Sequence, residues 1–264
     1  MSASMVESAD HTDAKVVADA LLRARREGRP VDASALAATL YDATGAYAVQ
    51  ELVARALQGP STDFPRFWKS GGPSRDAVLT HAALPANGVW TSPADARAWH
   101  CNMRLIEVEI ALRLGREVTA AEAARLTPAT AASLVDAMAV SIELVDSRWQ
   151  QGVQAPPLLK LADLQSHGAL VLGNWQPFSP RDWAHQECTV RIGARPIERR
   201  RGTHALGDPL WVLPEWLRHL TRKGAVVPEG TVVTTGTWCG VLPAASGDLV
   251  VACFEGVGQA SLQL

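Results

Sequence analysis

The chain has 264 residues, 47% of them hydrophobic, with 25 Lys and Arg against 27 Asp and Glu and a formal net charge of −2. This balance argues against a nucleic-acid-binding protein, which usually carries a strongly basic face, and the high hydrophobicity argues against disorder. No apolar stretch reaches the roughly 20 residues of a membrane span, and the first residues lack the basic and apolar regions of an export signal. The four Cys form no CxxC pair. We therefore expect reduced thiols, neither a membrane nor a nucleic-acid partner, and a cytoplasmic protein.

The beginning of the chain is rich in Ala and has a helical pattern. Between residues 13 and 27 apolar side chains recur at spacings of three and four, and a Gly-Arg-Pro sequence ends the pattern. A short second helix is predicted around residues 36–40. A third begins at Thr44, a suitable N-cap, and ends before Gly59-Pro60. We predict a small helical subdomain or arm over residues 1–65.

The rest of the chain is dominated by strand patterns. Residues 61–98, rich in Pro, Gly and Ser, are predicted to form an irregular loop. Beyond them, alternating apolar residues predict strands separated by Gly, Pro and Asp turns. The predicted strands cover 105–112, 140–145, 169–172, 188–192, 232–235 and 249–254, and predicted helices cover 119–136 and 213–222. A helical front and a strand-rich domain over residues 66–264 predict an α+β fold.

Three glutamates lie in these predicted strands in a pattern that indicates a metal site. Residues two apart in a strand share a face, so Glu107 and Glu109 point the same way while their apolar neighbours pack behind. Glu143 lies between two apolar residues of the next strand in the same manner. Converging carboxylates repel each other, and a divalent cation removes that repulsion. Oxygen donors without a nearby Cys or His favour Mg²⁺ or Mn²⁺ over zinc, with Asp146 as an alternative third ligand.

Several segments, taken in order, match the motifs of one family. Residues 106–116 are similar to its metal-binding strand, residues 141–148 to its third-ligand segment, and residues 230–237 to its closing strands. Over residues 40–264 the chain thus resembles the fumarylacetoacetate hydrolase superfamily, above all its 2-oxopent-4-enoate hydratase and 4-oxalocrotonate decarboxylase branch. The resemblance implies a helical arm followed by a mixed β-sandwich or roll of the C-terminal type of that superfamily.

The same resemblance implies a ligand set and two substrate contacts. In this family Mg²⁺ or Mn²⁺ sits on the carboxylates that match Glu107, Glu109 and Glu143, and it chelates a 2-oxo or enol oxygen and the C1 carboxylate of the substrate. Lys69 matches the Lys of the family's Gly-Lys-x-Gly loop and would hold the substrate carboxylate or deliver a proton. Ser166 matches a hydroxyl near the substrate carboxylate.

The chain also departs from the family pattern. The Pro-Asp-aromatic-Gly sequence that supplies a candidate acid/base group is absent from residues 76–90. His81 is the only imidazole of that segment and is our candidate substitute, with Asp76 as an alternative. The Asn-Ala-Ser sequence of the family is also missing, so His167, which follows Ser166, is a further candidate.

The resemblance leaves several functions open. One is a lyase of aromatic-compound degradation that hydrates a 2-hydroxy-alka-2,4-dienoate to a 4-hydroxy-2-oxoalkanoate, and its alternative is a 2-oxo-hex-3-enedioate (4-oxalocrotonate) decarboxylase. An acylpyruvate-type C–C hydrolase is disfavoured, because such relatives use a Glu–His pair ahead of the metal strand and no Glu lies between Glu51 and Glu107. Intact candidate ligands argue against a non-catalytic partner subunit. Like its relatives, the protein is expected to form a homo-oligomer or a complex with a sister subunit.

Overall fold

The computed structural model describes residues 3–58 and 64–264, and for residues 3–11 it describes the backbone alone. Contacts divide the chain into two units, one of Met1–Asp63, His100–Met103 and Val145–Gly168, the other of Phe64–Trp99, Arg104–Leu144 and Ala169–Leu264. Two later segments thus group with the helical front, and the division into domains after residue 65 stays a prediction. None of the described helices combines the length and the apolar composition of a membrane span.

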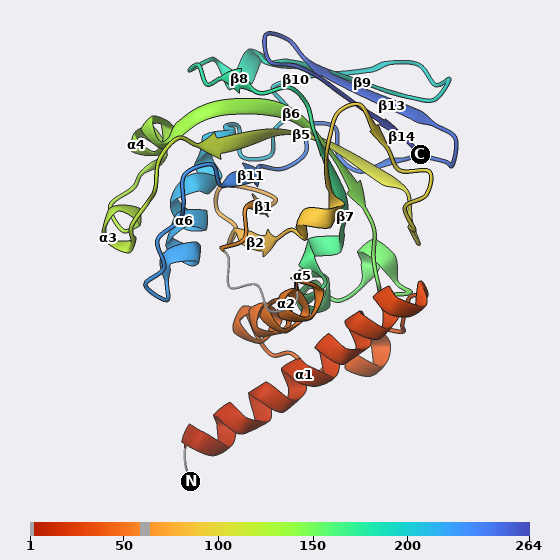
Figure 1. Ribbon diagram of the computed structural model, residues 1–264, viewed down its shortest axis with the longest axis vertical. Coiled ribbons are helices and arrows are strands. Elements are labelled where there is room, and N and C mark those ends of the chain that lie inside the picture. Colours follow the sequence, from red (N-terminus) through yellow and green to blue (C-terminus); the bar gives the residue numbers. More distant parts are fainter. Residues whose placement is uncertain (1–2, 59–63) are drawn as a thin grey trace. The chain divides into compact units, whose positions relative to one another are not determined.

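The first unit is helical, as its Ala-rich beginning predicts (Figure 1). Apolar residues of the predicted spacing, such as Val17, Leu21 and Val53, pack with Trp149 in a buried core. The first helix begins ten residues earlier than predicted, since no Gly or Pro before residue 13 ends it. The helices are α1 (Ala3–Glu27), α2 (Ala43–Gln58) and α5 (Pro157–Ala162), with 3-10 turns η1 (Ser34–Leu36), η4 (Gly152–Gln154) and η5 (Leu164–Ser166).

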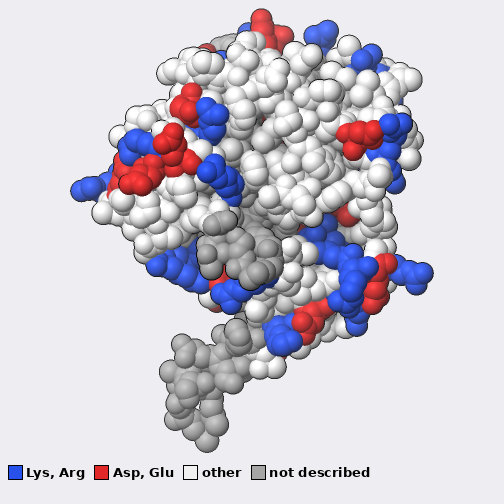
Figure 2. Space-filling view, viewed as in Figure 1, with Lys and Arg blue, Asp and Glu red and all other residues white. Residues whose placement is uncertain are grey.

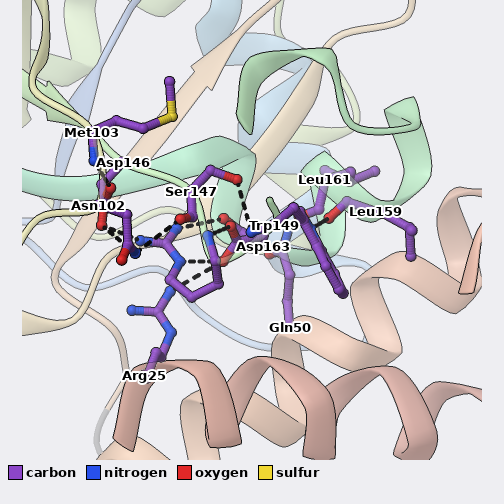
Figure 3. A network of polar contacts seen from close by, with 11 residues as sticks. Arg25, Gln50, Asn102, Met103, Asp146, Ser147, Trp149, Leu159, Leu161 and Asp163 are labelled. Carbon is purple, nitrogen blue, oxygen red and sulfur yellow. Dashed lines mark hydrogen bonds and ion pairs between the residues drawn. The ribbon is translucent and has the colours of Figure 1, made fainter. Parts of the chain in front are cut away.

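A buried network of charges joins segments of the first unit (Figure 3). Asp163, which has no exposed surface, accepts hydrogen bonds from the backbone N–H of Arg148 at 2.9 Å and from its Nε at 2.6 Å. The guanidinium of Arg25 lies 3.5 Å from the same carboxylate. Asp146 accepts the backbone N–H of Met103 at 2.7 Å and lies 3.5 Å from the Arg148 guanidinium. Each buried charge therefore has an opposite charge beside it.

The second unit is built on a large sheet. Among the described residues nine strands form it, in the order β2-β1-β11-β5-β6-β7-β3, with β12 paired to β5 and β8 to β6. The long strands β5 and β6 run side by side (Figure 1). The strands are β1 (Phe67–Gly71), β2 (Thr80–Ala83), β3 (Val89–Thr91), β5 (Leu105–Leu114), β6 (Val135–Val145), β7 (His167–Leu172), β8 (Gln176–Pro177), β11 (Val232–Thr234) and β12 (Leu242–Pro243).

A second sheet of the same unit has five strands, counted over the described part of the chain, in the order β10-β9-β13-β14-β4. They are β4 (Ala94–Asp95), β9 (Glu187–Ile192), β10 (Glu198–Arg201), β13 (Leu249–Phe254) and β14 (Gly258–Gln263). The helices of the unit are α3 (Ala120–Ala123), α4 (Pro128–Ala131) and α6 (Leu213–Thr221), with 3-10 turns η2 (Ala86–Gly88), η3 (Ala132–Leu134), η6 (Trp183–His185) and η7 (Pro209–Val212). The predicted α+β class is confirmed.

Two predicted regions differ from the structure. The segment 61–98, predicted to be an irregular loop, contains β1 to β4, whose alternating patterns are too short and too often interrupted by Gly, Pro and Ser to stand out. The predicted helix 119–136 is instead two single-turn helices, because Thr127 caps a new helix with Pro128 in its first turn. On the face shown in Figure 2, charged side chains of both signs are interspersed.

Candidate metal centre

Three glutamates converge on one face of the nine-stranded sheet. Glu107 and Glu109 lie two residues apart on β5, and Glu143 lies on the neighbouring strand β6. Alternate residues of a strand face opposite ways, so Val108 and Ile110 point to the other side, where they are fully buried. One carboxylate oxygen from each glutamate lies within 4.8 Å of one from each of the others. The strands thus bring together the three glutamates that the alternating pattern singled out.

Strand β1 brings Lys69 to the same face. Lys69 is in register with Thr234 of β11, and Thr234 with Ala111 of β5, so these three side chains leave the sheet on the side of the glutamates. The Nζ of Lys69 donates to Oε1 of Glu143 at 2.7 Å, and the Lys side chain is only 12% exposed. The structure therefore gathers four of the predicted site residues.

Two donors of the chain hold one oxygen of Glu109. The hydroxyl of Thr234 and the backbone N–H of Gly236, the latter at 2.9 Å, both donate to Oε2. The Thr234 hydroxyl also lies 2.9 Å from that of Ser141 on β6. Gly236 has a φ of +106°, a conformation that glycine adopts without the steric cost of a side chain. These bonds fix the orientation of the Glu109 carboxylate.

Burial and mutual repulsion disfavour the ionised forms of Glu107 and Glu109. Burial raises the pKa of Glu107 to about 8, opposed by Lys69 and reinforced by the other two glutamates. Burial, followed by the charge of Glu143, raises the pKa of Glu109 to about 7, while Lys69 and hydrogen bonds from the chain oppose the rise. Burial alone would lower the pKa of Lys69, but the three carboxylates outweigh it and raise that pKa above its ordinary value. The carboxylates thus favour an added cation.

This donor set fits a hard divalent cation. Three carboxylates face one ammonium group, so the ionised cluster has a surplus of negative charge. A dication balances that surplus, and a ligand set made of oxygen alone suits Mg²⁺ or Mn²⁺. Within the described residues, no other group of three His, Cys, Asp or Glu side chains lies close enough to hold a metal. The residues that could hold the ion are Glu107, Glu109 and Glu143.

His81 lies on the opposite face of the sheet from Lys69. It is in register with Ser70, the residue after Lys69, and its Nδ1 lies 2.9 Å from the Ser70 hydroxyl. Its ring is 4.8 Å from that of His219 on α6. Burial, followed by the charges of His219 and Arg222, lowers the pKa of His81 to about 3. The structure therefore does not bring this predicted acid/base candidate to the carboxylates.

Ser166 and His167 belong to the first unit, where both side chains are buried. Ser166 ends the turn η5, whose three residues all have φ between 51° and 60° although none is glycine. Such left-handed conformations are costly for residues with a β-carbon and persist only where the surroundings enforce them. The N–H of Ser166 donates to the carbonyl of Asp163, and its own carbonyl accepts from the N–H of Asp146, both at 2.9 Å. A substrate contact by Ser166 stays a prediction.

The remaining candidates have other surroundings. Asp146, the alternative ligand, contacts Met103 and Arg148 in the first unit and is not part of the described carboxylate cluster. Asp76 has an exposed side chain. Sequence reasoning gave no role to Thr234 or Gly236, although a Thr-Thr-Gly sequence at the end of a strand was a signal for a turn there.

Comparisons with known proteins identify a matching family and several relatives of this chain. The profile of the family described as "Fumarylacetoacetate (FAA) hydrolase C-terminal" matches residues 78–264. The chain is 30% identical over 158 residues to 2-keto-4-pentenoate hydratase 1 of Dechloromonas aromatica (strain RCB), which is 59% of this chain and 58% of that protein. It is 25% identical over 131 residues to a 4-oxalocrotonate decarboxylase of Pseudomonas sp., which is 50% of this chain and 49% of that protein. The matched segments thus span about half the length of these curated relatives.

Solved structures share the fold. The 4-oxalocrotonate decarboxylase of Pseudomonas putida G7, complexed with calcium and acetate, has a TM-score of 0.77 at 17% identity and covers 97% of both chains. A second structure of that enzyme is complexed with magnesium and adipate, has the same TM-score and identity, and covers 94% of this chain and 97% of its own. That enzyme holds calcium in one structure and magnesium in the other. In this chain, the described residues that could hold a metal ion are Glu107, Glu109 and Glu143.

Proposed function

The chain belongs to the fumarylacetoacetate (FAA) hydrolase C-terminal family, and we propose that it is a divalent-metal-dependent lyase that hydrates a 2-hydroxy-alka-2,4-dienoate to a 4-hydroxy-2-oxoalkanoate. The observation that supports this most is the convergence of Glu107, Glu109 and Glu143 within 4.8 Å, with Lys69 beside them. The name of the hydratase relative supports the choice of substrate class.

In this proposal each residue has a role that its surroundings allow. Glu107, Glu109 and Glu143 hold the ion, and Glu107 is the least buried of the three. A bound Mg²⁺ or Mn²⁺ supplies a Lewis acid for a 2-oxo or enol oxygen. The Lys69 ammonium attracts the negative charge of the dienoate and delivers a proton from Nζ as the dienol becomes a ketone. We propose that Ser166 contacts the substrate carboxylate. His81 takes no part in the proposed reaction.

A 4-oxalocrotonate-type decarboxylase is the alternative, and two observations favour it. One curated relative has that activity in its name, and the solved decarboxylase matches the present fold over nearly the whole chain. Both reactions use an electron-accepting 2-oxo group next to a carboxylate, so the same acidic cluster serves either one. The difference lies in what happens at the far end of the substrate: water adds to an alkene, or a second carboxylate leaves as CO₂.

One assay separates the candidates. The purified protein is incubated with Mg²⁺ and either a 2-hydroxydienoate or a 2-oxo-hex-3-enedioate, and the loss of ultraviolet absorbance is followed, with product masses determined. Gain of water supports the hydratase, loss of CO₂ the decarboxylase, and cleavage into two fragments a C–C hydrolase. Glu109→Gln, which keeps the shape of the side chain but removes its charge, is the matched control. No turnover of either substrate by the wild-type protein with Mg²⁺ would contradict the proposal.

A further inference from the structure

A buried histidine outside the carboxylate cluster supports the turn that holds Glu109. His204 follows β10 and is 5% exposed. Its Nε2 lies 2.8 Å from the backbone carbonyl oxygen of Thr235, to which it donates. Burial lowers the pKa of His204 to about 4, the Thr235 carbonyl opposing and Arg75 adding to the shift, so the ring is neutral at pH 7. A neutral imidazole has one N–H, and here Nε2 bears it.

The carbonyl that His204 binds lies between the two donors of Glu109. Thr234 and Gly236, on either side of Thr235, both donate to Oε2 of that glutamate. The Thr235 hydroxyl donates to the carbonyl of Ile110 on β5 at 2.8 Å. The side chain of Thr235 is therefore tied to β5 and its carbonyl to His204, and rotation of this peptide would displace the Gly236 N–H from Glu109.

Residues 203–204 also contact Trp238, at the other end of the segment 235–238. The His204 ring lies against the indole of Trp238, with the ring centres 5.4 Å apart. The backbone N–H of Trp238 donates at 2.9 Å to the carbonyl of Val108, the residue between the two glutamates of β5. The hydroxyl of Thr203 donates at 2.5 Å to the carbonyl of Trp238. Residues 203–204 thus support both ends of the segment 235–238 that lies along the metal-ligand strand.

One further feature sets His204 apart from a histidine that only fills space. Its Nδ1 is buried and has no hydrogen-bond partner among the described residues, and the same holds for Nε1 of Trp238. Leaving a buried polar atom unpaired costs free energy, so a phenylalanine would fill this space at lower cost. A histidine at this position donates a hydrogen bond to the Thr235 carbonyl, and a phenylalanine has no group that could do so.

We propose that His204 is a positioning residue of the metal centre, which fixes the Thr235–Gly236 peptide so that Oε2 of Glu109 stays bound to the chain and its other oxygen stays available to the cation. The inference rests on the proposed metal function. Residues that orient metal ligands typically contribute about 10- to 100-fold to metal affinity. His204 acts through Thr235 and Gly236 and does not itself contact the ion.

The test is a Mn²⁺ titration of the intact protein, followed by electron paramagnetic resonance of free Mn²⁺. His204→Phe removes the donor and is expected to weaken Mn²⁺ binding about 10- to 100-fold. His204→Gln keeps an N–H donor of similar reach and is expected to restore affinity to within about threefold of wild type. His185→Phe, the same substitution at an exposed histidine of η6, is the matched control and should bind like wild type. Circular dichroism in EDTA checks that each variant is folded.

Each outcome is informative. Wild-type affinity in His204→Phe, or equal losses in His204→Phe and His204→Gln, would overturn the positioning role. Should His204→Phe fail to fold, His204→Asn, which is too short to reach the Thr235 carbonyl, replaces it. A tenfold gap between the Asn and Gln variants would then support the inference, and equal affinities would overturn it. Absence of Mn²⁺ binding by the wild-type protein would instead contradict the proposed metal function.

Discussion

Two buried clusters of charged side chains in the described part of the chain differ in their balance of charge. In the first unit, Arg25 and Arg148 face Asp146 and Asp163, so positive and negative charges are equal in number. On β5 and β6 of the second unit, three glutamates face Lys69 alone. Charges buried in a protein are costly unless they are paired. The first cluster is therefore neutral overall. The second, when ionised, has an excess of two negative charges.

The titration behaviour of the two clusters follows from this difference. In the first, burial lowers the pKa of Arg25 to about 10, so the guanidinium stays charged at pH 7. In the second, the pKa values of Glu107 and Glu109 rise to about 8 and 7, so protons compete with a cation for binding to these carboxylates. Balanced charges of this kind hold segments of a fold together, while an unbalanced acidic cluster on a sheet face indicates a ligand.

Removing the single cation of the acidic cluster should have the largest effect on turnover. If Lys69 delivers a proton, Lys69→Met is expected to lower kcat by about 10² to 10⁴-fold. The affinity for Mn²⁺ should be retained or increase, because repulsion between the ammonium and the metal ion is lost. Steady-state kinetics and a Mn²⁺ titration measure the two quantities. Unchanged kcat would remove Lys69 from the mechanism, and a parallel loss of metal affinity would make its role structural.

Breaking the balanced cluster should instead destabilise the protein. Asp163→Asn leaves the buried Arg148 without its closest carboxylate, and loss of one partner of a buried pair costs about 3–5 kcal/mol. Urea unfolding followed by circular dichroism measures the free energy of unfolding. Asp95→Asn, which removes the partner of Arg97 in an exposed ion pair, is the matched control and should be close to wild type. Equal stabilities of the two variants would contradict the assignment of a structural role.

The unbalanced cluster should make the metal-free protein less stable as pH rises. The folded-state pKa values of Glu107 and Glu109 lie above the ordinary carboxyl value, so the folded state binds more protons than the unfolded state from about pH 5 upward. Stability is then present at low pH and lost as pH rises through about 7 to 8. The melting temperature in EDTA should fall between pH 6 and 9, and Mg²⁺ should restore it most at pH 9. A melting temperature that rises with pH in EDTA would contradict this prediction.

The smallest effect on turnover is expected at His81. Its ring faces Ser70 and His219 on the other side of the sheet, and its pKa of about 3 keeps it neutral throughout the assay range. We expect His81→Phe to change kcat by less than about threefold, as for substitutions remote from the chemistry, and to leave the pH–rate profile unaltered. Loss of a kinetic pKa near the unperturbed imidazole value of about 6.5 would restore His81 as the acid/base group.

The sequence predicts that the glutamates share a face of the sheet, but it does not predict the groups that donate hydrogen bonds to them. The long alternation of β5 predicts a shared face for Glu107 and Glu109 without knowledge of any partner strand. Lys69 was identified by family resemblance, since β1 is only five residues long. Thr234 and Gly236 could not be predicted as partners of Glu109, because they lie 125 and 127 residues away and only strand pairing brings them near. His81 was predicted because it is the only imidazole of residues 76–90, and the sequence did not show that its side chain lies on the opposite face of the sheet from Lys69.

We propose that the acidic cluster of β5 and β6 binds a divalent cation. Isothermal titration of Mg²⁺ at pH 7 in buffers of different ionisation enthalpy tests it most directly, because it reports affinity and proton release together. We predict one ion bound per chain, with release of protons from the glutamates, and loss of binding in Glu109→Gln. Equal binding by wild type and Glu109→Gln, or binding without proton release, would contradict the claim.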